Sequence, residues 1–281
     1  MVSKGSFPAI ENLPPLREVI SEHNLRAEKS LGQNFLLDQN ITDKIARHAG
    51  DLSDKNVIEI GPGPGGLTRS LLKAGAQKVI AVEFDQRAVS ALEGLKHASD
   101  GRLEILHADA LETNLVEICD APRVIVANLP YNIATSLLIG WLKDLRADAR
   151  AYDQMILMFQ KEVAERIAAQ PNNKSYGRLS VMSQWICDVQ KVFDLPASAF
   201  TPPPKVKSSV VKFTPRGLAD DAPSFEKVEA IVAAAFGQRR KMIRSSLSNY
   251  SQAIEKLEIN PELRAENLTV EQYIFLANLL T

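Results

Sequence analysis

Short apolar runs alternate with helical stretches across the middle of the chain. The β-rich runs span residues 57–60, 79–83, 103–106, 124–127 and 154–159. Segments with helical spacing of apolar residues, such as 67–74 and 88–95, separate these runs and are long enough for right-handed strand–helix–strand crossovers. This rhythm predicts a parallel β-sheet covered by helices, in a doubly wound α/β domain.

The pattern changes after a last β-branched run at residues 210–213. Residues 215–223 are rich in helix breakers and acids, and only helical periodicity follows them. Ser224 is the predicted N-cap of the first helix in this part of the chain, with Glu226 in its first turn. We therefore predict two domains, an α/β domain at residues 1–218 and a small helical domain at residues 219–281.

Composition limits the classes of protein to consider. With 45% hydrophobic residues, 281 residues can bury a large core and a small second one. No apolar run approaches the ~20 residues that span a bilayer, and the N-terminal segment resembles neither a signal peptide nor a transit peptide, so we expect a soluble, cytoplasmic protein. The two cysteines and four histidines are scattered, and we expect no metal site. A net charge of -1 can still hide a basic face.

The first predicted strand runs directly into the segment EIGPGPGG. Its glycines include Gly61, Gly63 and Gly66. Glycines let the backbone turn sharply and approach a ligand without interference from Cβ, and these three also match the GxGxxG pattern of NAD-binding enzymes. Pro62 and Pro64 remove amide donors, which disfavours a pyrophosphate but is harmless beside the nucleoside and methionine tail of S-adenosylmethionine. An NAD-dependent oxidoreductase stays open as an alternative.

Acidic residues follow the next two predicted strands. Glu83 ends the second run, where a carboxylate can accept hydrogen bonds from both hydroxyls of a ribose, which NAD and S-adenosylmethionine share. Asp109 lies at the tip of the third strand, where it can accept a hydrogen bond from the amine of the cofactor's adenine. Ligand contacts collect at these strand ends in open α/β sheets, so we predict a site for S-adenosylmethionine.

The fourth run ends in the tetrapeptide NLPY, which specifies the chemistry. The exocyclic amine of adenine is a weak nucleophile, because its lone pair is delocalised into the ring. Asn128 can supply a side-chain oxygen and Leu129 a backbone carbonyl as acceptors for this amine. Pro130 helps to fix the direction of the chain, and Tyr131 offers a ring on which the base can stack. We predict catalysis by alignment of the reacting atoms, without a strong general base.

The chain resembles the KsgA-type ribosomal RNA adenine dimethyltransferases. Besides NLPY, the segments that carry the resemblance are SLGQNFL at residues 30–36, FTPPPKVKSSV at residues 200–210 and FGQRRKMIRSSL at residues 236–247. The resemblance implies a Rossmann-like class I S-adenosylmethionine-dependent methyltransferase domain with a small α-helical C-terminal domain. It also implies that a helical segment at residues 1–50 covers the cofactor site, and that the C-terminal domain binds RNA or the ribosome.

The resemblance also implies roles for individual residues. Those expected to contact the cofactor are Asn34, Leu36, Gly61, Gly63, Glu83, Asp109 and Asn128. Phe200 is expected to be a second stacking surface near the target adenine, and a buried core phenylalanine is the alternative. With Phe200, the expected catalytic set is Asn128, Leu129, Pro130 and Tyr131.

The substrate that the resemblance implies is a pair of adjacent adenosines in a hairpin loop near the 3′ end of small-subunit (16S) ribosomal RNA. Each is methylated twice, during biogenesis of the 30S subunit. Methyltransferases of the antibiotic-resistance type, which modify large-subunit RNA, share the cofactor loop and stay open as an alternative. The QRRK sequence favours the KsgA type. A non-catalytic RNA-binding or assembly factor is a further alternative, and the presence of Asn128 and Tyr131 argues against it.

Basic residues gather in two places. Residues 151–216 contain nine Lys and Arg against five Asp and Glu. The second place is a cluster that we predict to contact RNA phosphates, formed by Arg239, Arg240, Lys241 and Arg244. The alternative is that these side chains pair with local acids and hold helices together.

Overall fold

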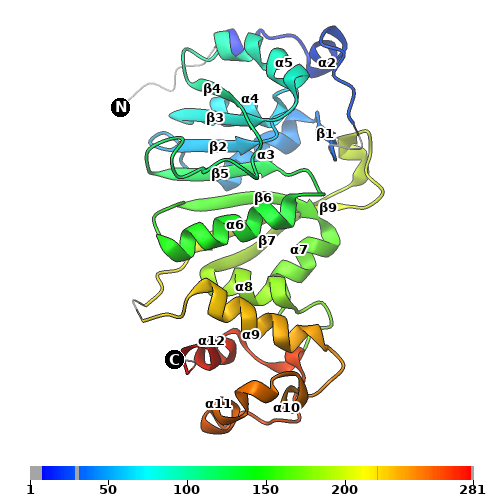
Figure 1. The fold of residues 1–281 in the computed structure, drawn as a ribbon. Coiled ribbons are helices and arrows are strands. Elements are labelled where there is room, and N and C mark those ends of the chain that lie inside the picture. The colour runs from blue at the N-terminus through cyan, green and yellow to red at the C-terminus, as the bar shows by residue number, and fades with distance from the viewer. Residues whose placement is uncertain (1–7, 29–31, 220, 280–281) are drawn as a thin grey trace. The chain divides into compact units, whose positions relative to one another are not determined.

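The computed structural model describes residues 8–28, 32–219 and 221–279 (Figure 1). The chain forms two compact units. The first contains Met1–Leu138, Arg150–Lys161 and Val192–Lys212, and the second contains Ile139–Ala149, Glu162–Lys191 and Phe213–Thr281. Each unit is assembled from several segments, whereas the predicted domains meet once, between residues 218 and 219. Compactness does not assign a function to either part, so the predicted division stays a prediction.

A seven-stranded sheet with the order β4-β3-β2-β5-β6-β9-β7 organises the described residues (Figure 1). Its strands are β2 (Asn56–Ile60), β3 (Lys78–Glu83), β4 (Leu103–His107), β5 (Arg123–Asn128), β6 (Gln154–Gln160), β7 (Cys187–Leu195) and β9 (Ser208–Pro215). The pairs β2–β3, β3–β4, β2–β5 and β5–β6 are parallel, which confirms the five predicted parallel strands. The chain moves outward from β2 to β4 and then returns to β5 beside β2. This reversal of strand order creates a crevice at the carboxyl ends of β2 and β5.

Burial explains why these runs form central strands. Four of the five residues of β2 are buried, as are the last five of β3, which is typical of parallel strands covered on both faces. Helix α4 (Gly66–Lys73) follows β2, and α5 (Gln86–His97) follows β3. The carboxylate of Asp85 caps α5 by accepting a hydrogen bond from the N–H of Arg87 at 3.0 Å. The two predicted crossover helices are confirmed.

The N-terminal part contains α1 (Pro8–Glu11), α2 (Leu16–Glu22), β1 (Phe35–Leu36) and α3 (Gln39–His48). Strand β1 pairs antiparallel with β8 (Phe200–Thr201), so that Leu36 lies opposite Phe200. Ser30 and Leu31, from the segment that carries the family resemblance, lie outside the described residues. The pairing of β1 with β8 was not predicted, because a two-residue strand leaves no periodic signal.

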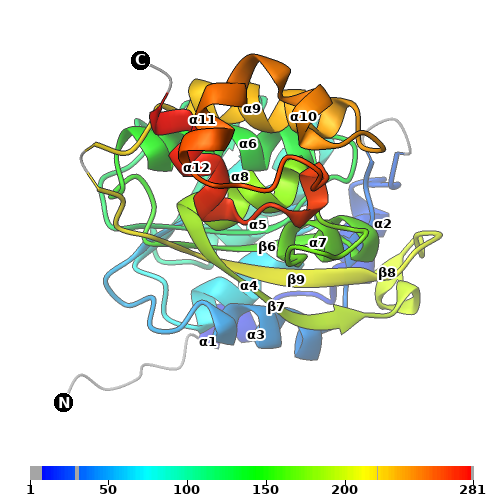
Figure 2. The same ribbon diagram turned by 90° about the horizontal axis from the view of Figure 1, so that it is seen from below.

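Helices dominate the chain beyond β9, as predicted. The elements beyond β9 are α9 (Phe225–Gly237), α10 (Ile243–Ser246), η2 (Ser248–Tyr250), α11 (Ser251–Lys256), η3 (Ala265–Asn267) and α12 (Val270–Asn278). The remaining elements before β9 are α6 (Ala134–Ala147), α7 (Lys161–Ala168), α8 (Arg178–Ile186) and η1 (Ala197–Ala199). Ser224 caps α9, since its hydroxyl accepts from the N–H of Lys227 at 3.3 Å. Figure 2 shows α9 to α12 gathered together. The centroid of the Phe236 ring lies 6.1 Å from that of Tyr176 and 6.0 Å from that of Tyr273. No helix among the described residues is long and apolar enough to cross a membrane.

Candidate active site

A cavity of about 1180 Å³, including its part open to solvent, lies at the carboxyl ends of β2, β3, β4 and β5. The predicted residues that line it are Asn34, Leu36, Gly61, Gly63, Glu83, Asp109, Asn128, Leu129, Pro130 and Tyr131. Phe200 is the one predicted catalytic residue that is not among the lining residues. The fold therefore brings together groups that lie up to about a hundred residues apart in the sequence.

Glycine is required at several positions of the loop between β2 and α4. Gly61 has a φ of 64° and Gly63 a φ of 55°, a left-handed conformation that costs other residues energy. At Gly66 the constraint is space, because a Cβ atom would lie 2.6 Å from the carbonyl oxygen of Leu36. Gly65, with a φ of 88°, is the N-cap of α4, a role that the sequence pattern did not single out. The loop thus holds its backbone close to both the cavity and the N-terminal segment.

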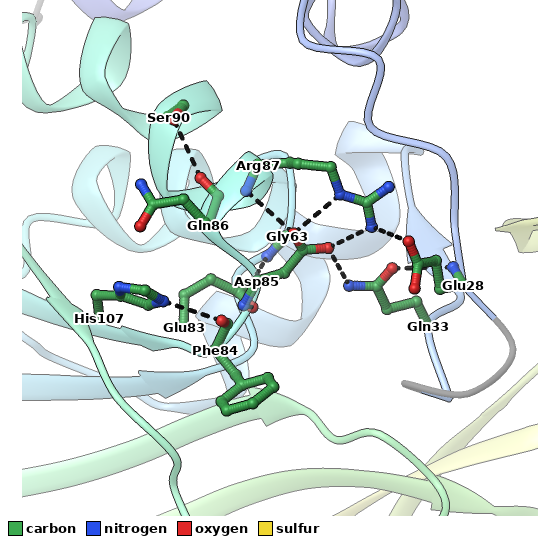
Figure 3. Close-up of polar contacts among 10 residues, drawn as sticks. All are labelled: Glu28, Gln33, Gly63, Glu83, Phe84, Asp85, Gln86, Arg87, Ser90 and His107. Atoms are coloured by element: carbon green, nitrogen blue, oxygen red, sulfur yellow. Dashed lines mark hydrogen bonds and ion pairs between the residues drawn. The ribbon is translucent and has the colours of Figure 1, made fainter.

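Glu83 lies at the end of β3 with only 5% of its surface exposed. One carboxylate oxygen accepts from the N–H of Gly63 at 3.1 Å, and the other accepts from the N–H of Asp85 at 2.8 Å (Figure 3). Burial raises the pKa of the Glu83 carboxyl, and these backbone hydrogen bonds oppose the increase. A carboxylate can accept about four hydrogen bonds, so Glu83 keeps acceptor capacity for a ligand hydroxyl beside these backbone donors. The N–H of Gly63, by contrast, is already used and is not free to bind a pyrophosphate.

The charge of the cavity also separates the two possible cofactors. Its described lining contains Glu59, Glu83, Asp85 and Asp109, but no lysine or arginine. A pyrophosphate would meet only like charge here, which argues against NAD. S-adenosylmethionine carries a sulfonium and an ammonium group, and both suit an acidic lining. The residues present therefore fit S-adenosylmethionine.

Glu59 is a buried acid at the base of this cavity, with 2% of its surface exposed. Its Oε2 atom has no hydrogen-bond partner among the described residues. Burial, together with the charge of Glu83, raises the pKa of the Glu59 carboxyl to about 8. Such a group is neutral at neutral pH unless a cation lies nearby.

The raised pKa of Glu59 predicts a dependence of stability on pH. The folded chain holds a proton on Glu59 up to about pH 8, whereas the unfolded chain releases it near pH 4.5. The ligand-free protein should therefore lose stability as the pH rises from about 5 to about 8, with little further loss from this group above that range. Glu59→Gln should flatten this slope. Denaturant unfolding of both proteins at several pH values measures it, and parallel slopes would contradict the role of Glu59.

The tetrapeptide NLPY turns away from the end of β5 into the cavity. The Nδ2 atom of Asn128 donates to the carbonyl oxygen of Asn34 at 3.0 Å. A carbonyl only accepts, so the amino group of Asn128 must face it, and the side-chain oxygen is left as an acceptor. The hydroxyl of Tyr131 shares a hydrogen bond of 2.6 Å with that of Ser208, and burial raises the pKa of the Tyr131 phenol. Both side chains are therefore held from outside the tetrapeptide.

Phe200 does not reach the cavity. Its side chain is 2% exposed and belongs to the hydrophobic core of the first unit, and its backbone lies opposite Leu36 in the pairing of β1 with β8. In this structure Phe200 packs as a core phenylalanine, the alternative considered from the sequence, and its role as a second stacking surface stays a prediction. An apolar side chain beside a short strand gains more free energy from burial than from exposure at a cavity.

The predicted basic cluster lies where helix α9 gives way to α10, and all four side chains are exposed. Arg239 pairs with Glu266, with 3.1 Å between Nε and Oε2. It also donates to the backbone carbonyls of Lys174 and Tyr176. Arg239 therefore joins distant segments of the second unit, as the structural alternative described. Contact of the cluster with RNA stays a prediction.

Three residues that support the site were missed from the sequence. Gln33 and Asp85 line the cavity and hydrogen bond to one another, and Ser208 holds Tyr131. Asp85 precedes a helix and carries the usual N-cap signal. Gln33 and Ser208 lie in segments that carry the family resemblance, but their individual roles depend on partners far away in the sequence. Among the described residues, no group of three or more His, Cys, Asp and Glu could hold a metal ion.

The fold and the acidic cavity define a class I S-adenosylmethionine-dependent methyltransferase. A solved dimethyladenosine transferase from Plasmodium falciparum has a TM-score of 0.72 and 28% sequence identity, over 85% of this chain and 94% of that one. The 23S rRNA methyltransferase ErmE has a TM-score of 0.67 and 25% identity, over 87% of this chain and 98% of that one. These similarities confirm the predicted fold class and cofactor.

The chain belongs to the ribosomal RNA adenine dimethylase family, whose model matches residues 24–281. It is 54% identical to the ribosomal RNA small subunit methyltransferase A of Paramagnetospirillum magneticum, over 96% of this chain and 95% of that protein. It is 51% identical to the protein of the same name from Rhodospirillum rubrum, over 95% of this chain and 92% of that one. The predicted enzyme class is confirmed, and its substrate is ribosomal RNA.

Proposed function

We propose that this chain transfers methyl groups from S-adenosylmethionine to two adjacent adenosines in the 3′-terminal hairpin loop of 16S ribosomal RNA. Each exocyclic amine receives two methyl groups. The observation that carries this proposal is the orientation of Asn128, whose oxygen is left as an acceptor beside an acidic cavity. The names of the small-subunit relatives support the choice of RNA.

In the proposed mechanism the residues of the chain position the amine. In the first transfer the Asn128 oxygen and the Leu129 carbonyl accept its two hydrogens, which draws the nitrogen toward tetrahedral geometry. In the second transfer the methylated amine has one hydrogen left, and one of these two acceptors binds it. Tyr131 stacks on the flipped base, and its hydrogen bond to Ser208 fixes the ring. Bound S-adenosylmethionine supplies an electrophilic methyl group. Alignment therefore lowers the barrier, and no strong base is needed.

The test is incubation with labelled S-adenosylmethionine and undermodified small subunits, followed by mapping of the methylated nucleotides. We expect label on two neighbouring adenosines of the 3′ hairpin. Label on large-subunit RNA instead would support the antibiotic-resistance type. The same experiment with subunits at different stages of assembly tests the proposed action on assembling 30S particles in the cytoplasm.

We also propose that part of the basic cluster contacts RNA phosphates. Arg240→Ala combined with Lys241→Ala should reduce the slope of log affinity against log salt by somewhat under ~1 unit per lost contact. Subunit binding should weaken most at low salt, while the melting temperature stays the same. Arg239→Ala is the matched control and should lower the melting temperature, because Arg239 joins Glu266 to two backbone carbonyls. An unchanged salt slope in the double variant would make the cluster structural.

A further inference from the structure

We propose that Gln33 is a positioning residue for methyl transfer. It holds the neighbouring carbonyl of Asn34 in the place from which that carbonyl orients the amide of Asn128. The inference rests on the proposed role of Asn128 and extends it to a residue that does not touch the reacting amine.

Gln33 is fixed at both ends of its side-chain amide (Figure 3). Its Nε2 atom donates to the Oδ2 atom of Asp85 at 3.1 Å, and its Oε1 atom accepts from the N–H of Glu28 at 3.0 Å. A carboxylate only accepts and an N–H only donates, so this pair of contacts allows a single orientation of the amide. Gln33 thus ties the residues before β1 to the N-cap of α5.

Asp85 is itself a rigid anchor. Arg87 donates to it in a bidentate pair, from Nε to Oδ1 at 3.0 Å and from Nη2 to Oδ2 at 2.7 Å (Figure 3). Hydrogen bonding from Arg87 is the main reason that the pKa of Asp85 is lowered to about 2. Arg87 also pairs with Glu28 at 2.8 Å. Asp85 is therefore ionised, and its contacts with Arg87 hold it in position independently of Gln33.

The carbonyl of Asn34 lies between two fixed points. Gln33 precedes it, and β1 follows it at Phe35, where the backbone pairs with β8. Between them, the Asn34 oxygen accepts from the amide of Asn128 at 3.0 Å. If the Gln33 anchor is lost, the carbonyl can move and the Asn128 amide can turn over. The amide would then present its amino group to the substrate amine, so two donors would face each other.

Variants of Gln33 that differ in charge test this chain of contacts. Gln33→Leu removes both hydrogen bonds and should lower kcat at saturating S-adenosylmethionine by about tenfold, since small misplacements are costly in positioned reactions. Gln33→Lys keeps a donor for Asp85 and should retain more activity. Gln33→Glu places a carboxylate against Asp85 and should retain least. Because Gln33 lines the cavity, its variants could also change cofactor binding. Calorimetry therefore measures the affinity of each variant for S-adenosylmethionine beside its kcat.

The outcomes separate this proposal from its rivals. A kcat for Gln33→Leu equal to that of the wild type would overturn it, and so would lost cofactor affinity with kcat retained. Because Gln33 acts through Asn128, Gln33→Leu should cost little more in an Asn128→Ala background, and an equal cost in both backgrounds would also overturn it. If Gln33→Leu does not fold, the ratio of kcat between the Lys and Glu variants decides. If the wild-type protein leaves the 3′ hairpin unmethylated, the proposed function is wrong. If the wild-type protein methylates it and Gln33→Leu does so at the same rate, only this inference is wrong.

Discussion

Replacing Asn128 with alanine is expected to lower kcat for methyl transfer by about 100-fold or more, with a much smaller effect on S-adenosylmethionine affinity. The side-chain oxygen acts mainly on the amine in the transition state, so its loss falls on the chemical step. Single-turnover methylation of undermodified small subunits measures the rate, and calorimetry measures cofactor binding.

The matched control for Asn128 is Tyr131→Ala, which should impair capture of the base and raise KM more than it lowers the rate at saturation. Asn128→Asp is a second control, because a carboxylate keeps an acceptor but opposes the carbonyl of Asn34. Near-normal turnover by Asn128→Ala would remove Asn128 from the mechanism. It would leave the fold and the cofactor site in place.

Glu83→Ala is expected to weaken S-adenosylmethionine binding by about 100-fold, or a few kcal/mol, through lost hydrogen bonds from the ribose hydroxyls. The change also frees the N–H groups of Gly63 and Asp85, which the carboxylate now binds. Glu83→Gln keeps one acceptor oxygen but turns its amino group toward one of these N–H groups, so it should recover only part of the affinity. Calorimetry on the three proteins measures the series, and equal affinities, or binding of NAD instead, would disprove the assignment.

Much of the fold follows from local pattern. The five parallel strands and the two crossover helices can be predicted because short β-rich runs alternate with segments of helical spacing. The N-cap of α9 can be predicted because Ser224 precedes a segment with helical periodicity. The strand ends then placed Glu83, Asp109 and Asn128 in one cavity, since parallel strands finish at the same edge of a sheet.

What could not be predicted depends on contacts between distant segments. Strand β7 (Cys187–Leu195) has a mixed burial pattern, so it shows no clean alternation. Phe200 is buried where β1 pairs with β8, and two strands this short leave no sequence pattern from which the pairing could be predicted. The ion pair between Arg239 and Glu266 joins residues that no helical or strand spacing relates. The roles of Phe200 and Arg239 therefore depend on partners that are distant in the sequence.

The acidic lining has a consequence for turnover. Asp85 is paired with Arg87, so the acidic side chains of the lining that remain to face a bound cation are Glu59, Glu83 and Asp109. Methyl transfer would leave the cofactor with a neutral thioether in place of the sulfonium, and these acidic side chains would then attract it less. We therefore expect the chain to hold the spent cofactor less tightly than the fresh one. Where one adenosine receives two methyl groups, this difference would favour release of the spent cofactor before the second transfer.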